Sequence, residues 1–142
     1  MATRLEVKEA LVAAFVAGWS GQTAPVTYDN ETFDSQSLSS FVRVAVRFFD
    51  SDIGALGGPG VSGQRKYTRV GAVFVQCFCR EGIGTRTADL LAEAAANIFE
   101  GKSFLSSQIR ISGRVPVIEI GPDGEGFYQI NVEANFEYDE RK

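Results

Sequence analysis

Residues 127–138, FYQINVEANFEY, decide the fold of this 142-residue chain. Apolar and polar residues alternate along this stretch, which is the two-residue period of a strand with one buried face. The side chains predicted to point inward are Tyr128, Ile130, Val132, Ala134, Phe136 and Tyr138. Glu133 and Glu137 then lie on the outward face, together with Gln129, Asn131 and Asn135. The pattern predicts a long strand that covers a core with one side.

Residues 40–49, SFVRVAVRFF, alternate in the same way. The apolar face is predicted to hold Val42, Val44, Val46 and Phe48. Arg43 and Arg47, with Ala45 between them, fall on the other face. This pattern predicts a half-buried antiparallel strand with a wet, positively charged face. A short extended piece at 25–28 precedes it.

Two further strands are predicted around these. Residues 67–80, YTRVGAVFVQCFCR, are apolar on both faces, so we expect a central strand covered by helix on one face and by something else on the other. Residues 108–120 are predicted to form a strand that changes phase near Gly113 and Pro116, and therefore to carry a bulge or lie at an edge. The turn 121–124, GPDG, leads into the final strand.

The N-terminal segment is predicted to be a helix. Thr3 and Glu6 form a capping box ahead of an apolar stripe that ends at Trp19. The apolar run at 10–18 is also typical of a short secretion signal. However, Glu6 and Glu9 stand where such a signal is basic, so we favour a helix of the folded protein.

A second helix is predicted at 86–100, where apolar residues recur at helical spacing. Thr85 or Thr87 would cap its start, and Gly101 would end it. The preceding turn at 82–85, GIGT, lacks the lysine of a phosphate-binding loop. We therefore interpret it as a plain turn from strand to helix.

Residues 50–66, DSDIGALGGPGVSGQRK, join two neighbouring strands by a long, Gly-rich connection. Loops of this length inside one domain are usually functional or disordered. Two interpretations stay open: a flexible tip, and a segment that becomes ordered on a partner. In the second case the interface residues would include Asp50, Asp52, Leu56, Val61, Arg65 and Lys66.

The order of these elements predicts an α+β fold with a mostly antiparallel sheet, two helices packed on one of its faces, and a long Gly-rich hairpin arm at 50–66. No linker or repeat divides the chain, so we expect a single domain over residues 1–142. No apolar run approaches the ~18 residues that a membrane span requires.

The composition argues against several classes of activity. The chain has no histidine, which removes Ser-His-Asp and Cys-His catalysis and most zinc or iron sites. A net charge of −4 argues against a protein whose main task is to grip nucleic-acid phosphates. Cys77 and Cys79 lie too close along one strand for ordinary disulfide geometry, so we expect free thiols in a protein made in a reducing cytoplasm. The carboxylates are predicted to be solvated, and we expect no catalytic, cofactor or metal site.

Charge is unevenly distributed along the chain. Residues 65–114 hold eight basic and four acidic residues, whereas the rest hold six basic and fourteen acidic ones. Arg43 and Arg47 lie ~13 Å apart on their strand, and Glu133 and Glu137 have the same spacing on theirs. These four residues are either ordinary solvated charges or the basis of Arg–Glu pairs between copies of the chain.

Over essentially its full length, the chain resembles the tail terminator (tail completion) proteins of long-tailed bacteriophages. The resemblance rests on the first helix up to Trp19, PVTYDN at 25–30, FVRVAVR at 41–47 and the Gly-rich arm. It continues through FVQCF at 74–78, GIGTRTAD at 82–89, YQINV at 128–132 and FEYD at 136–139.

This resemblance implies a small virion subunit, made in the host cytoplasm, that forms a homohexameric ring at the head-proximal end of the tail tube. Such a ring stops tube polymerisation and joins the tail to the head–neck connector. Its partners would be copies of itself, the tail tube protein and the connector protein. Double-stranded DNA would pass through the ring without specific binding, and no membrane, cofactor or enzyme activity is implied.

Two alternatives stay open. One is another neck or tail-tube component of the same virion. The other is a small enzyme that uses carboxylates alone, which would require a deep pocket that holds two acids with perturbed pKa values.

Overall fold

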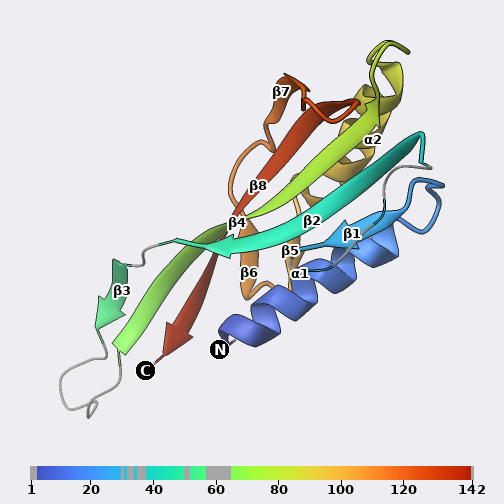
Figure 1. Ribbon diagram of the computed structural model, residues 1–142. Helices are drawn as coiled ribbons and strands as arrows, with labels where there is room; N and C mark the ends of the chain where they lie inside the picture. Colours follow the sequence, from blue (N-terminus) through green and yellow to red (C-terminus); the bar gives the residue numbers. More distant parts are fainter. Residues whose placement is uncertain are drawn as a thin grey trace.

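The computed structural model describes residues 3–29, 31, 34, 38–49, 52–56 and 65–141. The elements, in chain order, are α1 (Arg4–Gly18), β1 (Val26–Tyr28), β2 (Ser40–Phe48), β3 (Asp52–Leu56), β4 (Arg65–Arg80), α2 (Arg86–Phe99), β5 (Ser103–Phe104), β6 (Ile109–Ile111), β7 (Val117–Pro122) and β8 (Phe127–Arg141). They form the α+β fold that the sequence predicts (Figure 1).

The sheet has the strand order β1-β2-β4-β8-β6-β5. β3 also pairs with β4, and β7 also pairs with β8. β1 runs parallel to β2, whereas the pairs β2–β4, β4–β8 and β7–β8 are antiparallel. The longest ladder joins β4 to β8, from Lys66 opposite Arg141 to Arg80 opposite Phe127. The predicted central position of β4 is therefore confirmed.

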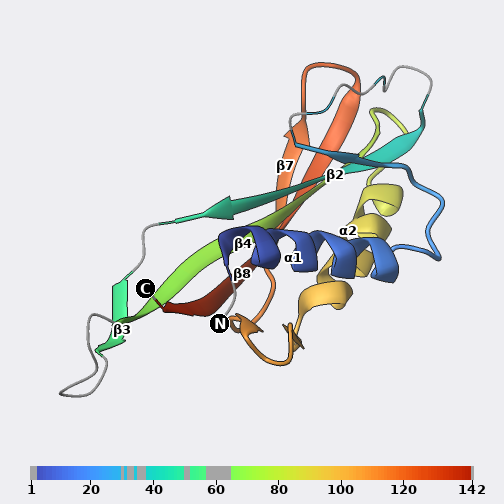
Figure 2. The same ribbon diagram turned by 90° about the horizontal axis from the view of Figure 1, so that it is seen from below.

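Both helices pack on one face of the sheet (Figure 2). Val44, Val75 and Val132 form a buried row across β2, β4 and β8 on this face. The inward residues predicted for β8 are all part of this core or packed against it. One buried face on each strand accounts for the alternation in the sequence.

The predicted helix signals are largely confirmed. The Thr3 hydroxyl accepts a hydrogen bond from the Glu6 N–H at 3.2 Å and donates one to the Glu6 carboxylate at 3.1 Å. At the start of α2, the Thr85 hydroxyl instead donates to the Asp89 carboxylate at 3.0 Å. Gly101 follows α2 with a φ of +72°, the left-handed conformation that ends many helices. No described helix is both long enough and apolar enough to cross a membrane.

The strand predicted at 108–120 is in fact two strands, β6 and β7. They pair with different parts of β8 and are separated by residues 112–116. Gly113 has a φ of +61°, and Pro116 has no N–H to donate, so this segment cannot continue a regular ladder. The predicted irregularity is therefore correct in position, but it divides the strand. The sequence prediction also missed the two-residue strand β5.

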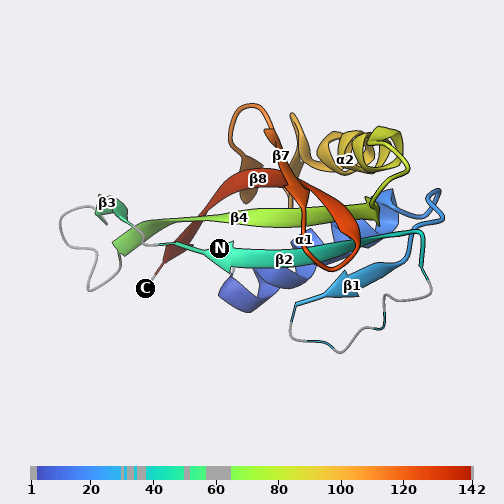
Figure 3. The same ribbon diagram turned by 45° about the horizontal axis from the view of Figure 1, so that its top comes forward.

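The Gly-rich stretch 50–66 contains more regular structure than predicted. β3 lies within it and pairs with the start of β4, which begins at Arg65 rather than at residue 67. Residues 50–51 and 57–64 lie outside the described residues. β3 and the adjoining ends of β4 and β8 extend away from the helices (Figure 3).

Candidate subunit interface

The sheet face opposite the helices carries the charged residues that the sequence analysis selected. Arg43 and Arg47 come from β2, and Glu133 and Glu137 come from β8, with β4 between the two strands. All four lie on the same, open face, as their alternation predicts. The basic pair lies toward one side of the sheet and the acidic pair toward its middle.

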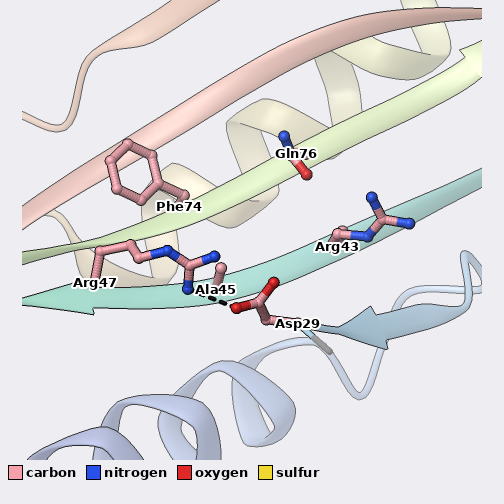
Figure 4. A pocket seen from close by; sticks show the side chains of 6 residues that line it. All are labelled: Asp29, Arg43, Ala45, Arg47, Phe74 and Gln76. Carbon is pink, nitrogen blue, oxygen red and sulfur yellow. Dashed lines mark ion pairs between the residues drawn. The ribbon is translucent and has the colours of Figure 1, made fainter. Parts of the chain in front are cut away.

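An open hollow of about 420 Å³ lies on this face over β2 and β4. Its lining consists of Asp29, Arg43, Ala45, Arg47, Phe74 and Gln76 (Figure 4). Phe74 is half-buried at the floor of this hollow. The sequence predicted that this face of β4 is covered, but no described part of the chain covers the middle of the strand. A second hollow, of about 250 Å³, shares Arg43 and Gln76 with the first and continues toward Asp123 and Glu125. An open, charged surface of this kind suits contact with another protein.

Ion pairs within the chain already use two of the four selected charges. Arg47 Nη1 lies 2.7 Å from Asp29 Oδ2. Arg110 Nε lies 3.2 Å from Glu137 Oε1. Partly exposed pairs of this kind contribute at most about 1 kcal/mol each, but they lower the charge that Arg47 and Glu137 present to another chain. Among the described residues, Arg43 has no ion pair and neither has Glu133, so these two are the charges available to a partner.

A small aromatic cluster closes one end of the open face. Phe41 stacks on Phe78 with ring centroids 4.5 Å apart and meets Phe127 edge-on at 5.1 Å. The Arg80 guanidinium lies 4.4 Å from the Phe127 ring centroid, and its Nε donates to the Leu38 carbonyl at 2.8 Å. Arg80 thereby ties the segment before β2 to the end of the sheet.

The variant Arg80→Ala is expected to lower the free energy of unfolding by about 1–2 kcal/mol, because it removes a cation–π contact and a charged hydrogen bond. Urea unfolding measures this loss. Arg86→Ala, at an exposed position at the start of α2, is the matched control and is expected to change stability by less than about 0.5 kcal/mol. Equal losses in the two variants would show that Arg80 has no special structural role.

The other residues predicted for the interface belong to the arm. Asp50 and Val61 lie outside the described residues. Asp52 and Leu56 are the end residues of β3, and Arg65 and Lys66 begin β4; for these four, the structure describes the backbone pairing alone. They lie at the end of the sheet remote from α2, so the structure does not bring them together with Arg43 (Figure 1).

Cys77 and Cys79 are free thiols that face the helices rather than the open face. Burial raises the pKa of Cys77 to about 12 and also raises that of Cys79. Both side chains therefore hold their protons at neutral pH. In the described part of the chain, no group of three or more acidic, cysteine or histidine residues could hold a metal ion.

Sequence reasoning missed one feature with a bearing on assembly. β7 carries three exposed apolar side chains, Val117, Ile118 and Ile120, which are 48, 43 and 52% exposed. In the sequence they form part of an ordinary apolar run. Their position at the outside of β8 becomes visible once the strand order is known.

No family model matches the chain, and no curated protein does. Solved structures share its fold. One, of a protein without a functional name, is 15% identical, covers 97% of this chain and 96% of its own, and has a TM-score of 0.67. Another is a chain from the virion of a native gene transfer agent particle. It is 13% identical, covers 94% of this chain and 95% of its own, and has a TM-score of 0.57. These likenesses extend over nearly the whole of each chain and concern the fold.

Proposed function

We propose that this chain is a structural protein of a phage-like virion and acts as a tail terminator. In this proposal, copies of the chain form a ring, homohexameric as in the family it resembles, at the head-proximal end of the tail tube. The observation that carries the proposal is the whole-chain likeness of fold to a chain of a gene transfer agent virion. The resemblance of its sequence motifs to those of tail terminators supports the more specific role.

The open sheet face supports assembly rather than catalysis. Arg43 at one side of this face and Glu133 near its middle have opposite charges and no ion pair in the described part of the chain. Opposite charges on two parts of one surface favour contacts between copies and oppose wrong orientations. In this proposal the chain has no enzymatic role and needs no cofactor. Its partners are further copies of itself, a tail tube protein and a head–neck connector, with DNA passing through the ring unbound.

Electron microscopy of the purified protein, alone and mixed with tail tubes of the virus that encodes it, tests this role. We expect rings, and tubes that carry a ring at one end and no longer elongate. The fold likeness alone also fits another virion component. Stacking of the rings into tubes would identify a tube protein, and binding to connectors without tubes would identify a neck protein. A protein that stays monomeric at all concentrations and binds neither structure would overturn the proposal.

Charge reversal tests the role of the open face. Arg43→Glu is expected to weaken self-association, because it reverses a charge on the open face and lowers the electrostatic complementarity between copies, and to leave the unfolding midpoint nearly unchanged. Glu133→Arg in the same chain is expected to restore part of the association. Light scattering over a wide concentration range measures both. If the second change restores nothing, Arg43 and Glu133 are ordinary surface charges with no part in assembly.

A further inference from the structure

The outer edge of β7 has no partner strand among the described residues. β7 pairs with β8 on one side, and the strand order places no described strand on the other (Figure 1). Exposed apolar edges are templates for pairing with another chain, and soluble proteins usually protect them with charges or prolines. Here Pro116 precedes the edge and Pro122 ends it, so any partner strand is limited to a short window.

The hydrogen bonds of β7 show which of its backbone groups are available. The Glu133 N–H donates to the Pro116 carbonyl at 3.2 Å. Since hydrogen-bonding residues alternate along an antiparallel ladder, Ile118 directs its backbone groups toward β8. Val117 and Glu119 therefore direct theirs outward. The edge thus offers two donor–acceptor positions that are two residues apart.

The free end of β2 offers the same arrangement. The Phe49 N–H donates to the Val70 carbonyl at 2.9 Å, so by the same alternation Val46 and Phe48 direct their backbone groups away from β4. β1 occupies the β2 edge at 42–44 and leaves this end uncovered by any described strand. Arg47 Nη1 lies 3.4 Å from the Val46 carbonyl, which keeps a second lone pair for a partner.

We infer that the β7 edge of one copy pairs antiparallel with the free end of β2 in a second copy, with Val117 opposite Phe48 and Glu119 opposite Val46. This inference rests on the proposed function, since it supplies the contact between neighbouring copies of the ring. The strand directions fit: β2, β4, β8 and β7 alternate, so a second copy in the same orientation presents β2 antiparallel to β7. The helices of both copies then lie on the same side of one continuous sheet.

The side chains on the helix side suit this register. Val117 lies opposite the buried Val132, so it points to the helix side, and it would contact Phe48 of the second copy. In the second copy, the Arg4 guanidinium lies 4.5 Å from the Phe48 ring centroid. Glu119 of the first copy lies opposite Val46 and is therefore a diagonal neighbour of Phe48. Antiparallel pairing of β7 with another β7 in the register centred on Glu119 would instead bring two Glu119 carboxylates together on one face, which is unfavourable.

On the open side, the pairing covers exposed apolar surface. Ile118 falls opposite Arg47 of the second copy, at the rim of the larger hollow. The β7–β8 register shifts by one residue between Glu119 and Gly121, so the regular part of the pairing ends at Glu119. The contact joins two different edges, so it is heterologous and generates a ring when the rotation between copies closes.

A cysteine pair tests the register. Ile118 and Arg47 would form a non-hydrogen-bonded pair with Cα atoms about 4.5 Å apart, within the range that disulfides span. Mild oxidation of the variant Ile118→Cys with Arg47→Cys is expected to give a ladder of disulfide-linked multimers on a non-reducing gel. The native Cys77 and Cys79 are buried and contribute little background. Each single variant, and Ile118→Cys combined with Arg43→Cys, are controls that should stay largely unlinked.

A proline variant supplies an independent measurement. Glu119→Pro removes an outward N–H at the last residue before the β7–β8 register shift, so association is expected to fall at least tenfold at a nearly unchanged melting temperature. Multimers that form without the disulfide ladder, or efficient linkage of Ile118→Cys alone into dimers, would overturn the inference and leave the ring proposal standing. Absence of multimers and of tube binding for the wild-type chain would overturn both.

Discussion

The variant Gly71→Ala is expected to lose about 3 kcal/mol of unfolding free energy, near the upper end of what overpacking usually causes. A Cβ atom at this position would lie 2.3 Å from the Arg47 carbonyl oxygen and 2.6 Å from the Phe136 ring. The first contact is with the backbone of β2, which cannot move away without disturbing the β2–β4 ladder. Urea unfolding followed by the fluorescence of Trp19, the single tryptophan and a buried one, measures the loss.

Gly21→Ala is the matched control, since a Cβ at Gly21 would have no heavy atom within 4 Å. Its effect is expected to stay within about 0.5 kcal/mol. An unchanged midpoint for Gly71→Ala would mean that the β2 backbone and the Phe136 ring can move away from Gly71 of β4 at little cost. The close approach of the strands at this point would then be unimportant for stability.

Phe15→Ala is expected to lower the unfolding free energy by about 3–5 kcal/mol, the range for removal of a fully buried aromatic side chain. Phe15 has no exposed surface, and its ring stacks on Trp19 at 5.0 Å and on Phe99 of α2 at 6.3 Å. Its removal leaves a cavity where the two helices meet. Circular dichroism during thermal or urea unfolding measures the loss.

The neighbouring variant Val16→Ala provides the comparison, because Val16 is 47% exposed on the same helix. Alanine favours a helix slightly more than valine does, so this change should be neutral within about 0.5 kcal/mol. Similar losses in both variants would attribute the effect to α1 as a whole and would contradict a specific role for the Phe15 ring.

Much of the fold could be predicted because one face of each long strand is buried. The alternation from Tyr128 to Tyr138 and around Val44 records that burial directly in the sequence. The capping box at Thr3 is equally local, since donor and acceptor are three residues apart. Both features depend on neighbours in sequence, which is why they could be predicted.

Features that depend on which strands become neighbours could not be predicted. The pairing of Arg110 with Glu137 requires the β6–β8 register, and that of Arg47 with Asp29 requires β1 to lie beside β2. β3 was missed because its glycine-rich surroundings have a loop composition. The exposed edge of β7 depends on strand order, about which a local pattern gives no information.

The β4–β8 ladder also governs how quickly this chain can fold. Its nearest pair, Arg80 and Phe127, is separated by α2 and by strands β5, β6 and β7, and the pair of Lys66 with Arg141 spans still more of the chain. Contacts of such large sequence separation require the closure of long loops before any pairing can offset the lost chain entropy. The hairpin of β7 and β8 involves far shorter closures. The chain therefore belongs with the proteins of high contact order, which fold more slowly than proteins that are rich in local contacts.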